Sequence, residues 1–193
     1  YKSTLKCYTS SIFKKNYYVI GHMSAIITSP MLESTVYVGM TGASQKEKVQ
    51  QVLINKLGLG IFGTTLKGKM EPVGKMKKTI SFYAKRGKLA YMRFRVNEEA
   101  IRRVMQFITY FQEKNEFGYV PCTMYNGALN PIYHYEGAAC SSFIIALMDA
   151  AGILPESAPQ KWAVNLNLPM HLIGGKMNDN KRVSLKSIIK TKE

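Results

Sequence analysis

The chain has 193 residues, of which 46% are hydrophobic and 11% aromatic. This composition excludes a disordered chain, and the length suits one domain, residues 1–193, around a single buried core. The formal net charge of +15 indicates attraction to polyanions such as anionic lipid, acidic wall polymers or nucleic acid, without distinguishing among them. No apolar run approaches the roughly 18 residues that a membrane span needs.

The number and spacing of the cysteines argue against a disulfide scaffold and against a zinc site. Three cysteines, Cys7, Cys122 and Cys140, cannot all pair within one chain, and none stands at metal-ligand spacing from another cysteine or from a histidine. The sequence therefore predicts neither a disulfide scaffold nor a zinc site, and no cofactor or metal is expected. A chain that begins at Tyr1 is read as a mature or trimmed product, so the question of a removed signal stays open.

The first part of the chain predicts an irregular lead-in over residues 1–16 and then an antiparallel hairpin. Residues 17–20 and 23–28 are β-prone and are interrupted by Gly21-His22, and a second β-prone run covers residues 35–38. Turn-forming residues at 29–33 separate the two runs. We therefore expect a hairpin that has His22 near its open end.

Further elements follow from capping signals and periodicity. Ser44-Gln-Lys-Glu47 has the spacing of a capping box and predicts a helix that Gly58 and Gly60 end. Residues 60–78, rich in Gly and Lys, predict a surface loop or a flap over a cleft. The β-prone runs 79–83 and 89–96 flank a basic turn at residues 85–88, which predicts a second hairpin.

The second half of the chain predicts two helices. Asn97 is a good N-cap before an acidic first turn, and an apolar face of Ile101, Val104, Met105, Ile108 and Phe111 follows it. Residues 115–136 are loop-like and rich in tyrosine, which suits either the lining of a cleft or a wet cover over the core. A mostly apolar helix then runs from Cys140 to Gly152, and a basic tail covers residues 181–192. These elements together indicate one α+β domain.

The chemistry centres on Cys140, which lies where a helix is predicted to begin. Unpaired backbone N–H groups and the positive end of the helix macrodipole lower the pKa of a thiol at such a position, and the same amides can hold an oxyanion. Cys140 is therefore a candidate nucleophile. A buried structural thiol is an equal alternative on the pattern alone.

A nucleophilic cysteine needs an imidazole, and the chain has three histidines: His22, His134 and His171. His134 lies close to Cys140 in sequence, and His171 lies in a turn-rich tail where a solvated or capping role is the ordinary interpretation. His22 is favoured as the base because a strand is a rigid platform.

The order of these motifs resembles the circularly permuted branch of the NlpC/P60 papain-like superfamily. The resemblance rests on residues 21–27 with a strand after them, on the run 89–96, on Phe117-Gly118-Tyr119, and on residues 135–143 with the helix that extends to Gly152-Ile153. It covers residues 17–153, and each motif is short, so the weight lies in their order and spacing. It implies a papain-like α+β fold in which a central antiparallel sheet packs on the helix that carries the nucleophile.

The resemblance also implies an activity and a site. It implies a cysteine peptidase, amidase or acyltransferase with Cys140 as nucleophile and His22 as base. A polar third residue is expected on the strand after the histidine strand, but Gly39 aligns there. We take Thr41 as the substitute, and Tyr37, Asn126 or a backbone carbonyl stay open as alternatives.

The predicted function is cleavage of amide bonds in bacterial cell-wall peptides, by a peptidoglycan endopeptidase or amidase that acts as a secreted, periplasmic or delivered toxin. Its partners would be peptidoglycan, another acidic polymer or a membrane surface, and an immunity or inhibitor protein. One alternative is a lipid or thioester hydrolase or acyltransferase of the same fold, and an inactive family member is another. An alternative of a different class is a basic nucleic-acid-binding module, which no RNP-like or helix-turn-helix signature supports.

Overall fold

A computed structural model describes residues 21–129, 131, 136–162 and 167–189. The chain divides into two compact units, one of residues 1–22, 44–66 and 164–193 and the other of residues 23–43 and 67–163. Each unit is described by itself below. The single domain expected from the sequence stays a prediction.

The first unit contains short helices around a small apolar core. Helix α2 (Gln45–Val49) continues into a π-helical turn (Gln50–Ile54), and Ser44 Oγ accepts a hydrogen bond of 3.1 Å from the Glu47 amide, as the capping signal predicts. Short 3-10 turns cover Leu59–Gly63, Met170–Leu172 and Lys176–Asn178, and α7 (Leu185–Ile189) lies within the predicted basic tail. The core side chains include Val52, Leu57, Ile61, Leu172, Ile173, Val183 and Ile188.

The second unit begins with the predicted hairpin. Strand β1 (Ala25–Ile27) pairs antiparallel with β2 (Val36–Val38), with Ile27 opposite Val36 beside the turn and Ala25 opposite Val38 at the open end. Leu32 N–H donates to Ser29 O across the turn at 3.1 Å. The prediction of an antiparallel hairpin is confirmed, and His22 lies just before its open end in the chain.

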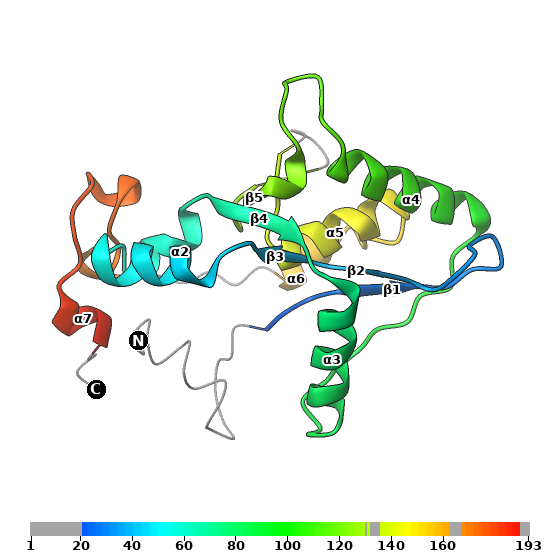
Figure 1. Cartoon of the computed structure of the whole chain (residues 1–193), viewed down its shortest axis with the longest axis horizontal. Coiled ribbons are helices and arrows are strands. Elements are labelled where there is room, and N and C mark those ends of the chain that lie inside the picture. The colour runs from blue at the N-terminus through cyan, green and yellow to red at the C-terminus, as the bar shows by residue number, and fades with distance from the viewer. Residues whose placement is uncertain (1–20, 130, 132–135, 163–166, 190–193) are drawn as a thin grey trace. The chain divides into compact units, whose positions relative to one another are not determined.

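A separate three-stranded sheet has the order β3, β4, β5. Strand β3 (Met40–Gly42) pairs antiparallel with β4 (Leu66–Met70), and β4 is also hydrogen-bonded to β5 (Met124–Tyr125). Figure 1 shows the chain passing from β2 into β3, with only Gly39 between them. Where a single central sheet was expected, the described residues therefore form two small antiparallel sheets.

The surface loop expected over residues 60–78 is wrong, because these residues form a 3-10 turn, strand β4 and the start of a helix. In β4, Leu66 and Gly68 are buried whereas Lys67 and Lys69 are exposed. This period of two is the signature of a strand with one solvated face. Of the lysines that suggested a loop, Lys67 and Lys69 are the outward residues of that strand, and the others lie in the helix that follows.

The second hairpin, expected over residues 79–96, is also wrong. Helix α3 (Val73–Ala84) begins after Pro72 and includes the run 79–83, while residues 88–97 contain no helix or strand. Met76 is buried, and Ile80 and Tyr83 are half-buried at helical spacing from it. That face packs against β2, and this tertiary contact overrides the β propensity of the run.

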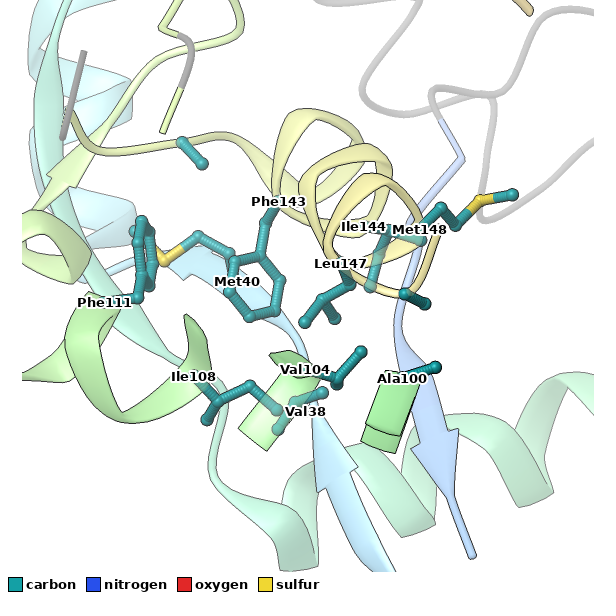
Figure 2. Close-up of a cluster of buried hydrophobic side chains, with 12 residues drawn as sticks. Val38, Met40, Ala100, Val104, Ile108, Phe111, Phe143, Ile144, Leu147 and Met148 are labelled. Carbon is teal, nitrogen blue, oxygen red and sulfur yellow. The ribbon is translucent and has the colours of Figure 1, made fainter. Parts of the chain in front are cut away.

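The main core lies between two long helices and the strands. Helix α4 (Glu98–Gln112) begins at Asn97, whose side chain accepts from the Ala100 amide at 2.9 Å, and α5 (Cys140–Ala150) packs against it. Figure 2 shows Met40 in this core together with Phe111 of α4 and Phe143 of α5, and with Val38 and Val104. The two phenyl rings have centroids 5.0 Å apart. Both helices confirm their predictions.

The C-terminal end of α5 is held by α4 and is followed by a glycine. Arg103 of α4 donates from Nε to the Ala150 carbonyl at 2.9 Å, which satisfies an acceptor in the last turn of α5. Gly152 follows with φ of +70°, as expected of a helix end. The short helix α6 (Ala158–Trp162) lies further along the chain. The fold is thus mixed α/β, with two small antiparallel sheets and helices.

Candidate active site

Cys140 is the first residue of α5, and small residues place it there. Gly137 lies so close to β5 that a Cβ atom would collide with Met124, and Ala138 is fully buried and donates its amide to Met124 O at 3.1 Å. A larger side chain at these positions would push the approach to the helix away from the strand. The small-residue run therefore fixes the thiol beside β5.

The N-cap residue at the start of α5 makes no side-chain cap hydrogen bond. The N-cap residue, Ala139, has no side-chain acceptor, and the Ser142 hydroxyl accepts from the Ala139 amide at 2.9 Å. The amides of the first helical turn point out of the helix N-terminus with the positive end of the macrodipole. This arrangement suits an anion at Cys140, either the thiolate itself or the oxyanion of a tetrahedral intermediate.

Tyr125 of β5 is a hydrogen-bond partner of the Cys140 thiol. Its hydroxyl donates to Cys140 Sγ at 3.9 Å, and both residues are half-buried. A phenol O–H can donate to a thiolate and stabilise it, while partial exposure leaves the sulfur accessible to a substrate. Tyr125, one of the tyrosines of residues 115–136, therefore contacts the candidate nucleophile, and the lining of a cleft by these tyrosines stays a prediction.

The other described thiol, Cys122, has a different environment. Both thiols are free, but Cys122 packs against the core, and burial raises its pKa above the ordinary thiol value although the backbone amides of Met70 and Cys122 partly counteract this. A raised pKa keeps a thiol protonated at neutral pH and so unreactive. Cys122 is thus the matched structural cysteine against which Cys140 can be compared.

The predicted base, His22, is exposed and lies three residues before β1. It is assigned to the first unit and Cys140 to the second. Their pairing therefore stays a prediction. Of the other histidines, His171 is exposed in a 3-10 turn of the first unit, and His134 lies outside the described residues.

The predicted third residue, Thr41, lies in the middle of β3 opposite Lys69. It is half-buried, and its hydroxyl has no hydrogen-bond partner among the residues that the structure describes. Of the two alternatives, Asn126 is buried and uses its side-chain oxygen to accept from the Ala128 amide at 2.9 Å, while the ring of Tyr37 lies 4.7 Å below Lys77 Nζ. The role of Thr41 stays a prediction.

Gly39, where a polar residue was expected, lies in a tightly filled space. A Cβ atom at Gly39 would lie 3.2 Å from Met76 Cε, 3.3 Å from Ser24 Cβ and 3.4 Å from Glu71 Oε2. No side chain fits there without displacing its neighbours. The glycine is therefore explained by packing, and a carboxylate lies where a polar side chain at position 39 would have been.

Glu71 is the residue that sequence reasoning missed. It follows β4 directly, its amide donates to Gly39 O at 2.7 Å, and the residue is only 7% exposed. Buried glutamates are rare and are held by polar partners or charges. Two signals were present in the sequence: the alternation along residues 66–70, and the fact that Glu71 is the one acidic residue in the basic stretch 60–78.

Neither a metal site, a membrane span nor a known relative accompanies the candidate site in the described part of the chain. Among the described residues, no group of three or more His, Cys, Asp or Glu side chains is placed to hold a metal ion, and no helix is long and apolar enough to cross a membrane. No protein-family model, curated protein or solved structure matches the chain.

Proposed function

We propose that the protein is a cysteine hydrolase that cleaves amide bonds in bacterial cell-wall peptides through an acyl-enzyme. The observation that carries the proposal is the placement of Cys140: a half-buried residue that opens α5, whose N-cap residue Ala139 makes no side-chain cap, and that receives a tyrosine hydroxyl on its sulfur. A helix N-terminus lowers the pKa of a thiol, and a hydroxyl donor stabilises the thiolate, so both features favour a nucleophile at this position.

The proposed reaction has two half-steps. The Cys140 thiolate attacks the scissile carbonyl, and the developing oxyanion is held by amides of the first turn of α5. The His22 imidazolium donates its proton to the leaving amine, and a thioester to Cys140 remains. Neutral His22 then takes one proton from water as the water attacks the thioester, and collapse of the intermediate releases the acid and restores the Cys140 thiolate and the His22 imidazolium.

We assign Glu71, ahead of Thr41, as the group that orients His22. A Cβ atom at Gly39 would lie 3.4 Å from the Glu71 carboxylate and 3.3 Å from Ser24 Cβ, and Ser24 is two residues after His22 in the chain. A carboxylate accepts a charge-assisted hydrogen bond from an imidazolium, which is roughly twice as strong as the neutral bond that a hydroxyl offers. The buried Glu71 carboxylate would thus replace the missing side chain at Gly39.

Replacing Glu71 by glutamine should lower kcat by about 100-fold, the scale of one acid–base contribution. The alkaline limb of the pH–rate profile should also move to lower pH, because the imidazolium loses a negative neighbour and gives up its proton more easily. A merely structural role would not move that limb.

Thr41→Val is the control for Glu71→Gln. It removes the hydroxyl of the competing candidate with little change of shape. If Thr41→Val lowers kcat and moves the alkaline limb while Glu71→Gln does neither, the assignment of Glu71 is contradicted.

Digestion of purified peptidoglycan tests the proposed function. The wild-type protein should release new peptide fragments visible by mass spectrometry, and protein alkylated beforehand with iodoacetamide should release none. Phospholipid and thioester substrates should be assayed in parallel. If wall peptides stay intact while a lipid or thioester is hydrolysed, the wall assignment fails and the lipid alternative replaces it.

A further inference from the structure

The connection between α3 and α4 is an exposed segment of the second unit that carries several apolar side chains. Every residue from Ala84 to Arg95 is exposed, including Leu89 at 46%, Tyr91 at 86% and Met92 at 63%. Figure 1 shows this stretch as a connection without helix or strand. Single exposed apolar residues are ordinary, but a gathered set of them marks a surface that something else covers.

Positive charge accompanies these apolar side chains. Residues 73–96, from the start of α3 to the residue before the N-cap of α4, contain no Asp or Glu. They contain Lys75, Lys77, Lys78, Lys85, Arg86, Lys88, Arg93 and Arg95, and all of these are exposed. The segment 73–96 is called the basic–apolar segment below. Its charge complements a dense anionic surface.

The kind of apolar residue separates a lipid partner from a nucleic acid. Val73, Leu89 and Met92 are aliphatic, and aliphatic side chains have no use in stacking on bases, whereas they insert readily among acyl chains. Phe82 and Phe94 are also exposed, and Arg86 lies over the Phe82 ring with its guanidinium carbon 3.5 Å from the centroid. Aromatic rings flanked by Arg and Lys are typical of the membrane–water interface.

We propose that the basic–apolar segment docks the protein on an anionic lipid bilayer, with Leu89, Met92 and Phe94 at the depth of the upper acyl chains and the Lys and Arg side chains on the headgroups. Docking of this kind needs no spanning helix, because the segment lies at the surface of the bilayer. It would hold the protein at a membrane, where wall precursors and lipids are both within reach. Docking does not require hydrolysis, and it is independent of Cys140.

Vesicle co-sedimentation tests the proposal with the full chain. The wild-type protein should pellet with vesicles of phosphatidylcholine and phosphatidylglycerol, and not with phosphatidylcholine alone. The double variant Arg93→Gln/Arg95→Gln should bind the anionic vesicles about 30-fold more weakly, from roughly fivefold for each basic side chain near the surface. Cys140→Ala should bind as the wild type does, so docking and hydrolysis fail or succeed separately.

Matched variants distinguish binding through the basic–apolar segment from nonspecific adsorption through any exposed apolar side chain. Met92→Ser/Phe94→Ser should weaken vesicle binding at least tenfold, whereas Phe117→Ser, which removes a ring that is 63% exposed elsewhere in the unit, should not change it. All these positions are exposed, so circular dichroism should show unchanged folding.

Insertion can be read directly with Tyr91→Trp. Its emission should shift to the blue and be quenched by brominated lipid, with the signal of Trp162 subtracted by means of the parent protein. The proposal is overturned if the wild type ignores anionic vesicles, or if the segment variants and Phe117→Ser bind equally. It is likewise overturned if the segment variants lose affinity for single-stranded RNA while vesicle binding stays intact.

Discussion

Replacing Cys140 by alanine should abolish hydrolysis, with a loss in kcat on the order of 10⁴-fold or more. The thiolate forms the covalent bond to the acyl group, and no other group in the proposed mechanism can take its place. The start of α5 would keep its amides, so any residual rate would come from binding and oxyanion stabilisation alone. The measurement is steady-state kinetics on whichever substrate the protein is found to cleave.

Cys122→Ala is the matched control, because it removes the other described thiol of the same unit and should retain activity. The two thiols should also differ in alkylation, measured in a Cys7→Ser background. Iodoacetamide should label Cys140 at mildly acidic pH, whereas Cys122 should react only at higher pH, since burial raises its pKa and reduces its thiolate fraction. Equal, slow labelling of both would contradict a catalytic thiol, as would full activity in Cys140→Ala.

Replacing Phe143 by alanine should lower the free energy of unfolding by about 3–5 kcal/mol. The side chain is fully buried, and its ring contacts those of Phe107 and Phe111, with centroids 6.0 Å and 5.0 Å away. Its removal would leave a cavity beneath the first turn of α5 (Figure 2). A loss of this size is a large share of the stability of a typical domain. Urea unfolding followed by circular dichroism would measure it.

The comparison for Phe143→Ala is Ile145→Ala on the same helix. Ile145 is 38% exposed, so its truncation should cost about 1 kcal/mol or less. If the two variants unfolded at the same urea concentration, the core described between α4 and α5 would be contradicted.

The elements that the sequence predicted well are those whose local signals agree with their packing. In α4, the N-cap at Asn97 and the apolar face identify the same helix, and the residues that the periodicity selects are buried except Met105, which is half-buried. In α5, the small-residue approach, the apolar run and Gly152 agree in the same way. Where capping, period and composition coincide, tertiary contacts have nothing to override.

The predictions for residues 60–78 and 79–96 were wrong because in each case one feature of the sequence outweighed the hydrophobic spacing. Lysine content concealed the alternation in β4, and the β propensity of residues 79–83 concealed the spacing of Met76, Ile80 and Tyr83 along α3. No local pattern indicates that residues 89–96, which were predicted to form a strand, would pair with no other strand, because pairing is a property of the whole fold.

The residues of the candidate site also differ in how well the sequence predicted them. The position of Cys140 at a helix start followed from its neighbours in sequence, and the structure has it there. Glu71 could not be placed from sequence, since its approach to Gly39 joins residues from the end of β4 and the junction after β2. Tyr125 was one of several loop tyrosines, and only its hydrogen bond to Cys140 separates it from the others.

Gly39 has a consequence for how this chain can change in evolution. Val38 and Met40 both enter the core because one residue separates them, although Val38 pairs with β1 and Met40 pairs with β4. Insertion or deletion of a single residue here would reverse which side chains face inward along one of the two sheets. The turn at residues 29–34, by contrast, joins two strands of one hairpin and is exposed at most positions, so it can change in length. Length variation among descendants of this sequence should therefore collect at that turn and be absent between Val38 and Met40.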